Sequence, residues 1–237
     1  MKSEQITTFF YEGLKMKKLN TCFNLIIEAL KWPCAILMLI LLIPAMQADM
    51  YVIERLTNMD VLIHFFLPFG ATAILFLFMP ALAGSFFAIM EHELTHMFFA
   101  VLTFHKPKGL DVNQDVGGSF SFEGKGNWLV ALAPYFFPLF WFFLILLTPI
   151  YTSFTGKLPE FYLPMLGVFA GYNFIVSCLS IHPKQTDFKV AGYFFTICFL
   201  PGVLFLKYGM IFCYSIKGMP GLEAYIELII QKLGTFI

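Results

Sequence analysis

The chain has 237 residues, of which 59% are hydrophobic and only 13% are charged, and its formal net charge is zero. Soluble domains carry roughly one quarter charged residues, so the composition excludes an ordinary soluble protein and indicates a chain surrounded largely by lipid. The balanced charge also gives no reason to expect a nucleic-acid partner.

A polar and basic stretch, residues 1–31, precedes the first long apolar run. We expect a cytoplasmic or interfacial segment there, a membrane-embedded domain over residues 32–214 and an interfacial tail over residues 215–237. Lysine and arginine are enriched on the cytoplasmic side of membrane segments. The lysines that favour a cytoplasmic position for both termini are Lys15, Lys17, Lys18, Lys31, Lys207, Lys217 and Lys232. With both termini in the cytoplasm, Lys106, Lys108 and Lys125 would lie on the outer side, which the same rule disfavours. The side of the membrane that the site faces therefore stays open.

Six stretches of the chain are long and apolar enough, or nearly so, to cross a membrane. A helix needs about 20 predominantly apolar residues to span roughly 30 Å of hydrocarbon. The stretches are residues 32–52, 61–79, 82–104, 128–151, 161–181 and 188–206. The sequence therefore predicts an all-α polytopic membrane protein with about six transmembrane helices.

Two stretches interrupt the helical pattern. Residues 106–127 contain five glycines, and residues 116–123 alternate apolar with small or polar side chains, which predicts a short re-entrant strand. Residues 181–188 form a polar interruption between two apolar runs. Non-helical backbone is tolerated at membrane depth only where it lines protein or a water-filled cavity. Both stretches are therefore candidates for parts of a site.

The tail beyond Pro220 is amphipathic. Its acidic residues Glu223 and Glu227 lie off the apolar face, which predicts a C-terminal helix resting in the membrane interface. The residues on the apolar face are Leu222, Tyr225, Ile226, Ile229 and Leu233.

The third apolar run contains the motif His92-Glu93-x-x-His96. Residues four apart project from one face of a helix, so both imidazoles can bind one zinc ion. Glu93, next to the first ligand, can take a proton from zinc-activated water and pass it to the leaving amine. The pattern also occurs by chance on soluble helices, but a cluster of ionisable residues inside an apolar run is costly and indicates a functional site.

A catalytic zinc ion usually has three protein ligands and one water. Candidates for the third ligand are Asp187, Glu123, His182 and His105. Asp187 is preferred because it lies in the polar interruption of residues 181–188. The alternative is that Asp187 is an ordinary loop residue or a helix N-cap. Glu123 would instead give a gluzincin-type membrane peptidase, similar to the prenyl-protein peptidases. His105, beside Lys106, is better explained as a residue at a helix end.

These residues together resemble the site-2 protease family of intramembrane zinc metalloproteases. An HExxH motif in a membrane helix, a Gly-rich strand-like stretch and an aspartate in a broken downstream helix occur in the same order over roughly residues 82–206. The resemblance implies one zinc ion on His92, His96 and Asp187, with Glu93 as the catalytic residue. Phe188 stands where the family has glycine after the aspartate.

The resemblance also implies that the strand-like stretch binds an unwound substrate peptide by strand addition. The substrate-binding candidates are Gly117, Gly118, Ser119 and Phe120. His182 and Asn173 are candidates for stabilising the oxyanion or for hydrogen-bonding the ligands. Pro134, Pro138 and Pro164 could shape helices that admit the substrate.

The sequence therefore predicts an integral membrane protein, suited to a bacterial inner membrane, that hydrolyses peptide bonds of membrane-spanning or membrane-anchored protein substrates. Its expected partners are these proteins and membrane lipids. A zinc-binding membrane scaffold without turnover is the first alternative, and the retained Glu93 argues against it. A transporter with Asn173 and His182 along its path is the second. The sequence contains no repeat and no second cluster of intramembrane charges, and this argues against a transporter.

Overall fold

The computed structural model describes residues 2–83, 85–113 and 117–236, and these form helices with one small sheet. Met1, where the predicted N-terminal segment begins, and Val116, where the predicted strand begins, lie outside the described residues. The elements in chain order are α1 (Lys2–Glu54), α2 (Met59–Val61), the π-helical turn η1 (Leu62–Phe66), α3 (Leu67–Phe78), α4 (Pro80–Ala83), α5 (Phe86–Leu102), β1 (Pro107–Asn113), β2 (Gly117–Phe122), α6 (Trp128–Phe136), α7 (Leu139–Thr155), α8 (Tyr162–Ser180), α9 (Thr186–Ala191), α10 (Tyr193–Lys217) and α11 (Met219–Phe236).

The protein is an integral membrane protein, as its helices indicate. Among the described residues, four helical stretches are long and apolar enough to cross a membrane, and a bent pair raises this number to five. The four are 17–54, 59–78, α8 and α10, and the bent pair is α6 with α7. Two of the six predicted runs differ from a single spanning helix. In the described part of run 82–104 the main helix, α5, has only 17 residues, and run 128–151 is broken between α6 and α7, which meet at 78°.

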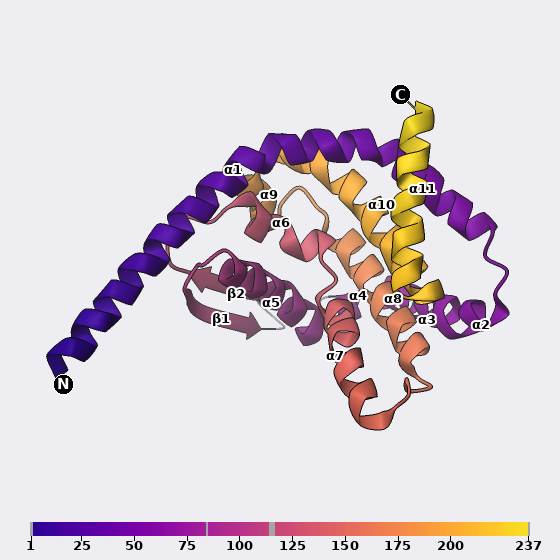
Figure 1. The fold of residues 1–237 in the computed structure, drawn as a ribbon, viewed down its shortest axis with the longest axis horizontal. Helices are drawn as coiled ribbons and strands as arrows, with labels where there is room; N and C mark the ends of the chain where they lie inside the picture. Colours follow the sequence, from indigo (N-terminus) through magenta and orange to yellow (C-terminus); the bar gives the residue numbers. More distant parts are fainter. Residues whose placement is uncertain (1, 84, 114–116, 237) are drawn as a thin grey trace.

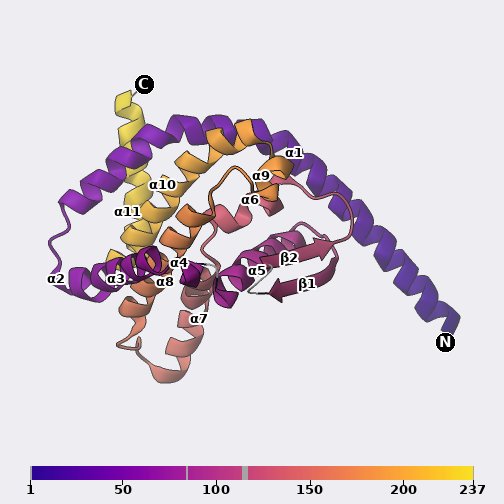
Figure 2. The same cartoon turned by 180° about the vertical axis from the view of Figure 1, so that it is seen from behind.

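Helix α1 is unusually long, with 53 residues, and its later part packs along α10 and α11. Its N-terminal part projects away from the other elements in both views (Figure 1, Figure 2). The boundary that we predict near residue 31 lies inside this continuous helix. Many of its large apolar side chains are exposed, which suits a helix that faces lipid.

Small residues bring α8 close to the segment formed by η1 and α3. A Cβ atom at Gly167 or Gly171 would collide with the backbone carbonyl groups of Phe65 and Phe69. Glycines spaced four apart allow such close packing of membrane helices, because no side chain separates the two backbones.

The Gly-rich stretch forms an antiparallel hairpin rather than a single strand. Strand β2 lies within the predicted strand, residues 116–123, and β1 pairs with it in a register that places Leu110 opposite Phe120. Strand β1 was not expected from the sequence. Both strands pack against α5, the helix with the HExxH motif (Figure 2).

Helix α11 forms as predicted and packs on α10 and α1, but its buried face is narrower than the predicted apolar face. Tyr225 and Ile229 are buried, whereas Ile226 is 52% exposed. Lys207 was counted with Lys217 and Lys232 among the lysines that favour a cytoplasmic C-terminus, but its position does not suit that use. It lies inside α10 and is buried among other helices, so it carries no information about orientation.

Candidate metal centre

Three predicted ligand residues meet at one place. His92 and His96 lie one turn apart on α5, and Asp187 lies in the first turn of the short helix α9. The Nε2 atom of His92 lies 3.2 Å from Nε2 of His96 and 3.3 Å from Oδ2 of Asp187. The Nε2 atom of His96 lies 3.5 Å from the same carboxylate oxygen. Among the described residues, these three form the group of side chains able to hold a metal ion.

The size of this triangle fits zinc. Zn–N bonds of about 2.0–2.1 Å and Zn–O bonds of about 2.0–2.2 Å in a tetrahedral arrangement separate the ligand atoms by about 3.3–3.5 Å. The three observed separations are 3.2, 3.3 and 3.5 Å. Two imidazoles and one carboxylate are also a common ligand set of catalytic zinc.

Helix α6 fixes the orientation of His96. The Nδ1–H group of His96 donates a hydrogen bond to the carbonyl oxygen of Val130, 2.8 Å away. Because a carbonyl only accepts, this contact leaves the Nε2 lone pair of His96 directed to the cluster. Helix α6 is held at its start by the buried Asn127, whose side chain accepts from the backbone N–H of Val130.

Tyr135 is part of the cluster, although the sequence analysis did not select it. It is fully buried on α6, its hydroxyl donates to Oδ2 of Asp187 at 2.8 Å, and its ring packs edge-on against His92. A tyrosine in an apolar run is also typical of a core or interface residue. The sequence signal that could have indicated the interruption here is the pair Pro134 and Pro138, which the prediction of one run over residues 128–151 did not use.

The hairpin lies directly against Glu93. This side chain is buried, and a Cβ atom at Gly118 would lie only 2.6 Å from its Cγ atom. Strand β2 can therefore approach Glu93 only because residue 118 is glycine. The predicted substrate-binding residues Gly117 to Phe120 thus lie on the strand next to the predicted catalytic glutamate.

Several other candidates lie elsewhere. Glu123 is exposed and lies 3.9 Å from Lys106, so the alternative in which Glu123 completes the zinc site disagrees with the structure. His182 is exposed in a turn, where its Nδ1 atom accepts from the backbone N–H of Lys184. His105 is buried and bonded to its neighbours, in agreement with a structural role.

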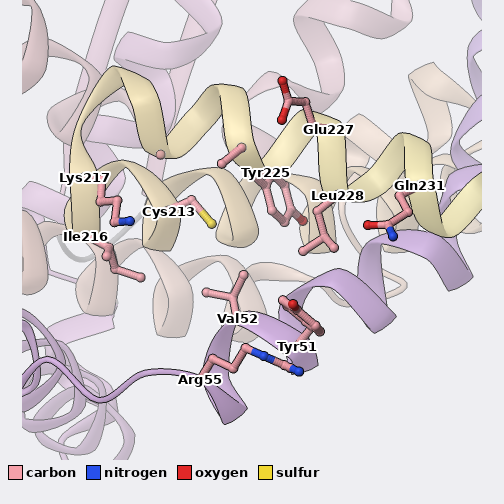
Figure 3. A pocket seen from close by; sticks show the side chains of 12 residues that line it. Tyr51, Val52, Arg55, Cys213, Ile216, Lys217, Tyr225, Glu227, Leu228 and Gln231 are labelled. Carbon is pink, nitrogen blue, oxygen red and sulfur yellow. The ribbon is translucent and has the colours of Figure 1, made fainter.

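Asn173 is buried on α8 and lines a small cavity together with His92, Glu91 and Ser177. This cavity has a volume of about 10 Å³, which is room for about one water molecule. A larger cleft of about 370 Å³ lies elsewhere, between α1, α10 and α11, and contains none of the cluster residues (Figure 3).

Comparison with known proteins agrees with this geometry. The sequence profile described as Peptidase M50B-like matches residues 70–206, which is more than half of the chain and includes the whole His-His-Asp cluster. No curated protein and no solved structure gives a significant match. The chain therefore belongs to the Peptidase M50B-like family of the site-2 proteases, which are membrane metallopeptidases.

Proposed function

We propose that this protein is an intramembrane zinc metalloprotease that hydrolyses peptide bonds of membrane-spanning or membrane-adjacent proteins. The observation that carries the proposal is the triangle formed by His92, His96 and Asp187, whose edges of 3.2–3.5 Å suit one tetrahedral zinc ion. The family match supports the reaction class.

In this proposal, His92, His96 and Asp187 hold one zinc ion. Bound zinc supplies the Lewis acidity that makes water a nucleophile near neutral pH. Glu93 would accept a proton from the attacking water as the water oxygen adds to the scissile carbonyl carbon. Glu93 then delivers the proton to the amide nitrogen as the C–N bond breaks, which gives a free carboxylate and an amine.

The substrate must reach this centre as extended backbone, because the carbonyl groups of an intact helix are hydrogen-bonded internally. We propose that an unwound peptide pairs with β2 along Gly117 to Phe120. Pairing of main-chain groups is a common way to bind an extended peptide at a strand edge. The approach of Gly118 to Glu93 supports this position, because it brings a peptide on β2 next to the proposed catalytic carboxylate.

The test is the zinc content per chain of detergent-purified protein. We expect close to one zinc ion in the wild type, and loss of zinc in His92→Ala and in Asp187→Ala. Glu123→Ala is the matched control, since it removes an exposed carboxylate outside the cluster and should keep the metal. A wild-type protein that holds no zinc after careful metal loading would contradict the proposal.

A zinc-binding scaffold without turnover remains the second candidate, because the triangle alone would serve it equally well. Glu93→Gln separates the two functions. It keeps the size of the side chain and removes the base, so zinc should stay bound while turnover falls by roughly 10²–10⁴-fold. A wild-type protein that binds zinc but cleaves no membrane-protein substrate would favour the scaffold.

A further inference from the structure

The break between α6 and α7 exposes two helix ends inside the protein. Helix α6 ends at Phe136, α7 begins at Leu139, and their axes differ by 78°. The last carbonyl groups of one helix and the first N–H groups of the next have no partners within their own helices. In a membrane domain such groups need partners from elsewhere in the protein, because lipid offers none.

Two buried ionisable side chains supply partners at this break. The Nζ atom of Lys207, on α10, donates to the carbonyl oxygen of Tyr135 at 3.4 Å. The Oε1 atom of Glu91, on α5, accepts from the backbone N–H of Phe140 at 3.3 Å. A lysine at a helix C-terminus and a carboxylate at a helix N-terminus match the polarity of those ends. Both side chains are almost fully buried, with 4% of Lys207 and 5% of Glu91 exposed.

Each of the two residues is connected to the metal centre through one neighbouring residue. Lys207 binds the backbone of Tyr135, and the hydroxyl of this same tyrosine donates to Asp187 at 2.8 Å. Glu91 immediately precedes His92 on α5. The position of the break is therefore coupled to a ligand on each side, Asp187 through Tyr135 and His92 through the chain itself.

Lys207 also fixes a polar group next to the centre. Its Nζ atom donates to Oδ1 of Asn173 at 3.0 Å, and the hydroxyl of Tyr208 donates to the same oxygen at 3.2 Å. With its oxygen held by two donors, Asn173 has only its NH₂ group to offer to the small cavity that it lines with His92. An N–H donor in that place suits a carbonyl oxygen or an attacking water.

We propose that Lys207 and Glu91 are positioning residues of the metal centre. They hold the two ends of the broken segment, and thereby keep Tyr135 hydrogen-bonded to Asp187 and the NH₂ group of Asn173 beside His92. This inference rests on the proposed zinc function. Lys207 lies one residue beyond the part of the chain that matches the family profile.

A double-mutant cycle on zinc affinity tests this route. The dissociation constant of zinc is measured by competition with a chelator for Lys207→Met, Glu91→Leu and Tyr135→Phe, and for each of the first two combined with Tyr135→Phe. Loss of a group that orients a metal ligand typically weakens metal binding by 10–100-fold. We expect each single variant to weaken zinc binding by about tenfold. Because Lys207 acts through Tyr135, Lys207→Met combined with Tyr135→Phe should match Tyr135→Phe alone within about twofold, since coupled residues are not additive. Glu91 acts through His92 instead, so the effect of Glu91→Leu should multiply with that of Tyr135→Phe.

A second measurement does not depend on catalysis or on affinity. The absorption spectrum of Co²⁺ bound in place of zinc reports the coordination geometry, and we expect the spectra of Lys207→Met and Tyr135→Phe to change in the same way. If Lys207→Met does not fold, the same cycle is run with Lys207→Gln, which keeps an N–H donor on a shorter side chain.

Two control variants separate positioning from general stability. Lys217→Met removes an exposed lysine from the same helix, and Asp49→Asn disturbs a buried carboxylate bonded to Tyr225 far along the chain from the cluster. Asp49→Asn should lower the unfolding temperature, and neither control should change zinc affinity or the Co²⁺ spectrum.

Wild-type zinc affinity in both Lys207→Met and Glu91→Leu would overturn the inference. An effect of Lys207→Met that multiplies with that of Tyr135→Phe would overturn it too, because Lys207 would then act by a route other than Tyr135. In either case wild-type zinc binding and the loss in His92→Ala would persist, so the proposed function would stand. Absence of zinc from the wild type would remove both together.

Discussion

Gly118 is the residue at which the hairpin comes closest to the proposed general base. A methyl group there would meet both Cγ of Glu93, at 2.6 Å, and Cγ2 of Ile89, at 2.5 Å. Neither neighbour can move freely, since both belong to α5, and Cβ atoms essentially never come so close to another side chain. The strand or the glutamate must therefore shift when a side chain is added.

We expect Gly118→Ala to lower turnover by at least tenfold while zinc stays bound, because a misplacement of about 1 Å at a catalytic group costs roughly 10²-fold. Gly109→Ala is the matched control in the same hairpin, since its Cβ would meet only the hydroxyl of Ser121 at an ordinary 3.5 Å. Both variants are assayed for zinc content and for cleavage of a membrane-protein substrate. Unchanged turnover in Gly118→Ala would show that the hairpin does not need to lie against Glu93.

At the scale of the element, the nine-residue helix α6 organises the cluster although it contributes none of the three proposed ligands. Its start is capped by Asn127, its first turn offers the carbonyl of Val130 to His96, and its last turn offers the hydroxyl of Tyr135 to Asp187. So short a helix is marginal by itself, and its stability comes from caps and packing. Asn127 also donates to Asn24 of α1 at 2.7 Å, which ties α6 to the long helix.

Asn127→Ala should therefore weaken zinc binding as well as folding. Loss of an N-cap costs about 0.5–2 kcal/mol of stability, and the shifted helix would carry Val130 and Tyr135 away from the ligands. Asn58→Ala is the matched control, because Asn58 caps α2 by accepting from the backbone of Asp60 and Val61, outside the centre. Thermal unfolding and chelator competition are measured on both. Equal zinc affinity in the two variants would argue against a role of α6 in the centre.

Across the whole molecule, the sequence predicts the parts of the fold that depend on local spacing. His92 and His96 share a face because a helix repeats every 3.6 residues, and Asp187 is found from its place in a polar interruption of apolar sequence. The hydrogen bond of Tyr135 to Asp187 joins residues 52 positions apart, and no local pattern indicates it.

Two further features could not be predicted for related reasons. Strand β1 contains Lys108, Gly109 and Asp111, which are poor strand formers, and it forms because β2 supplies its hydrogen-bond partners. Lys207 resembles the basic flank of a membrane helix, since the apolar run preceding it ends at Leu206. Its burial becomes evident only because α10 continues to Lys217 and packs against α1.

The cluster joins α5 to α9, elements separated by about 95 positions along the chain, so an ion bound there should stabilise the folded molecule as a whole. A ligand that binds only the folded state adds about 2.7 kcal/mol at a concentration of one hundred times its dissociation constant. We expect zinc to raise the unfolding temperature of the detergent-solubilised wild type, and a chelator to lower it again. Asp187→Ala should show no such shift, whereas Glu123→Ala should respond like the wild type because its carboxylate lies outside the cluster. A wild type that retains one zinc per chain but unfolds at the same temperature with and without it would mean that the ion does not connect these helices.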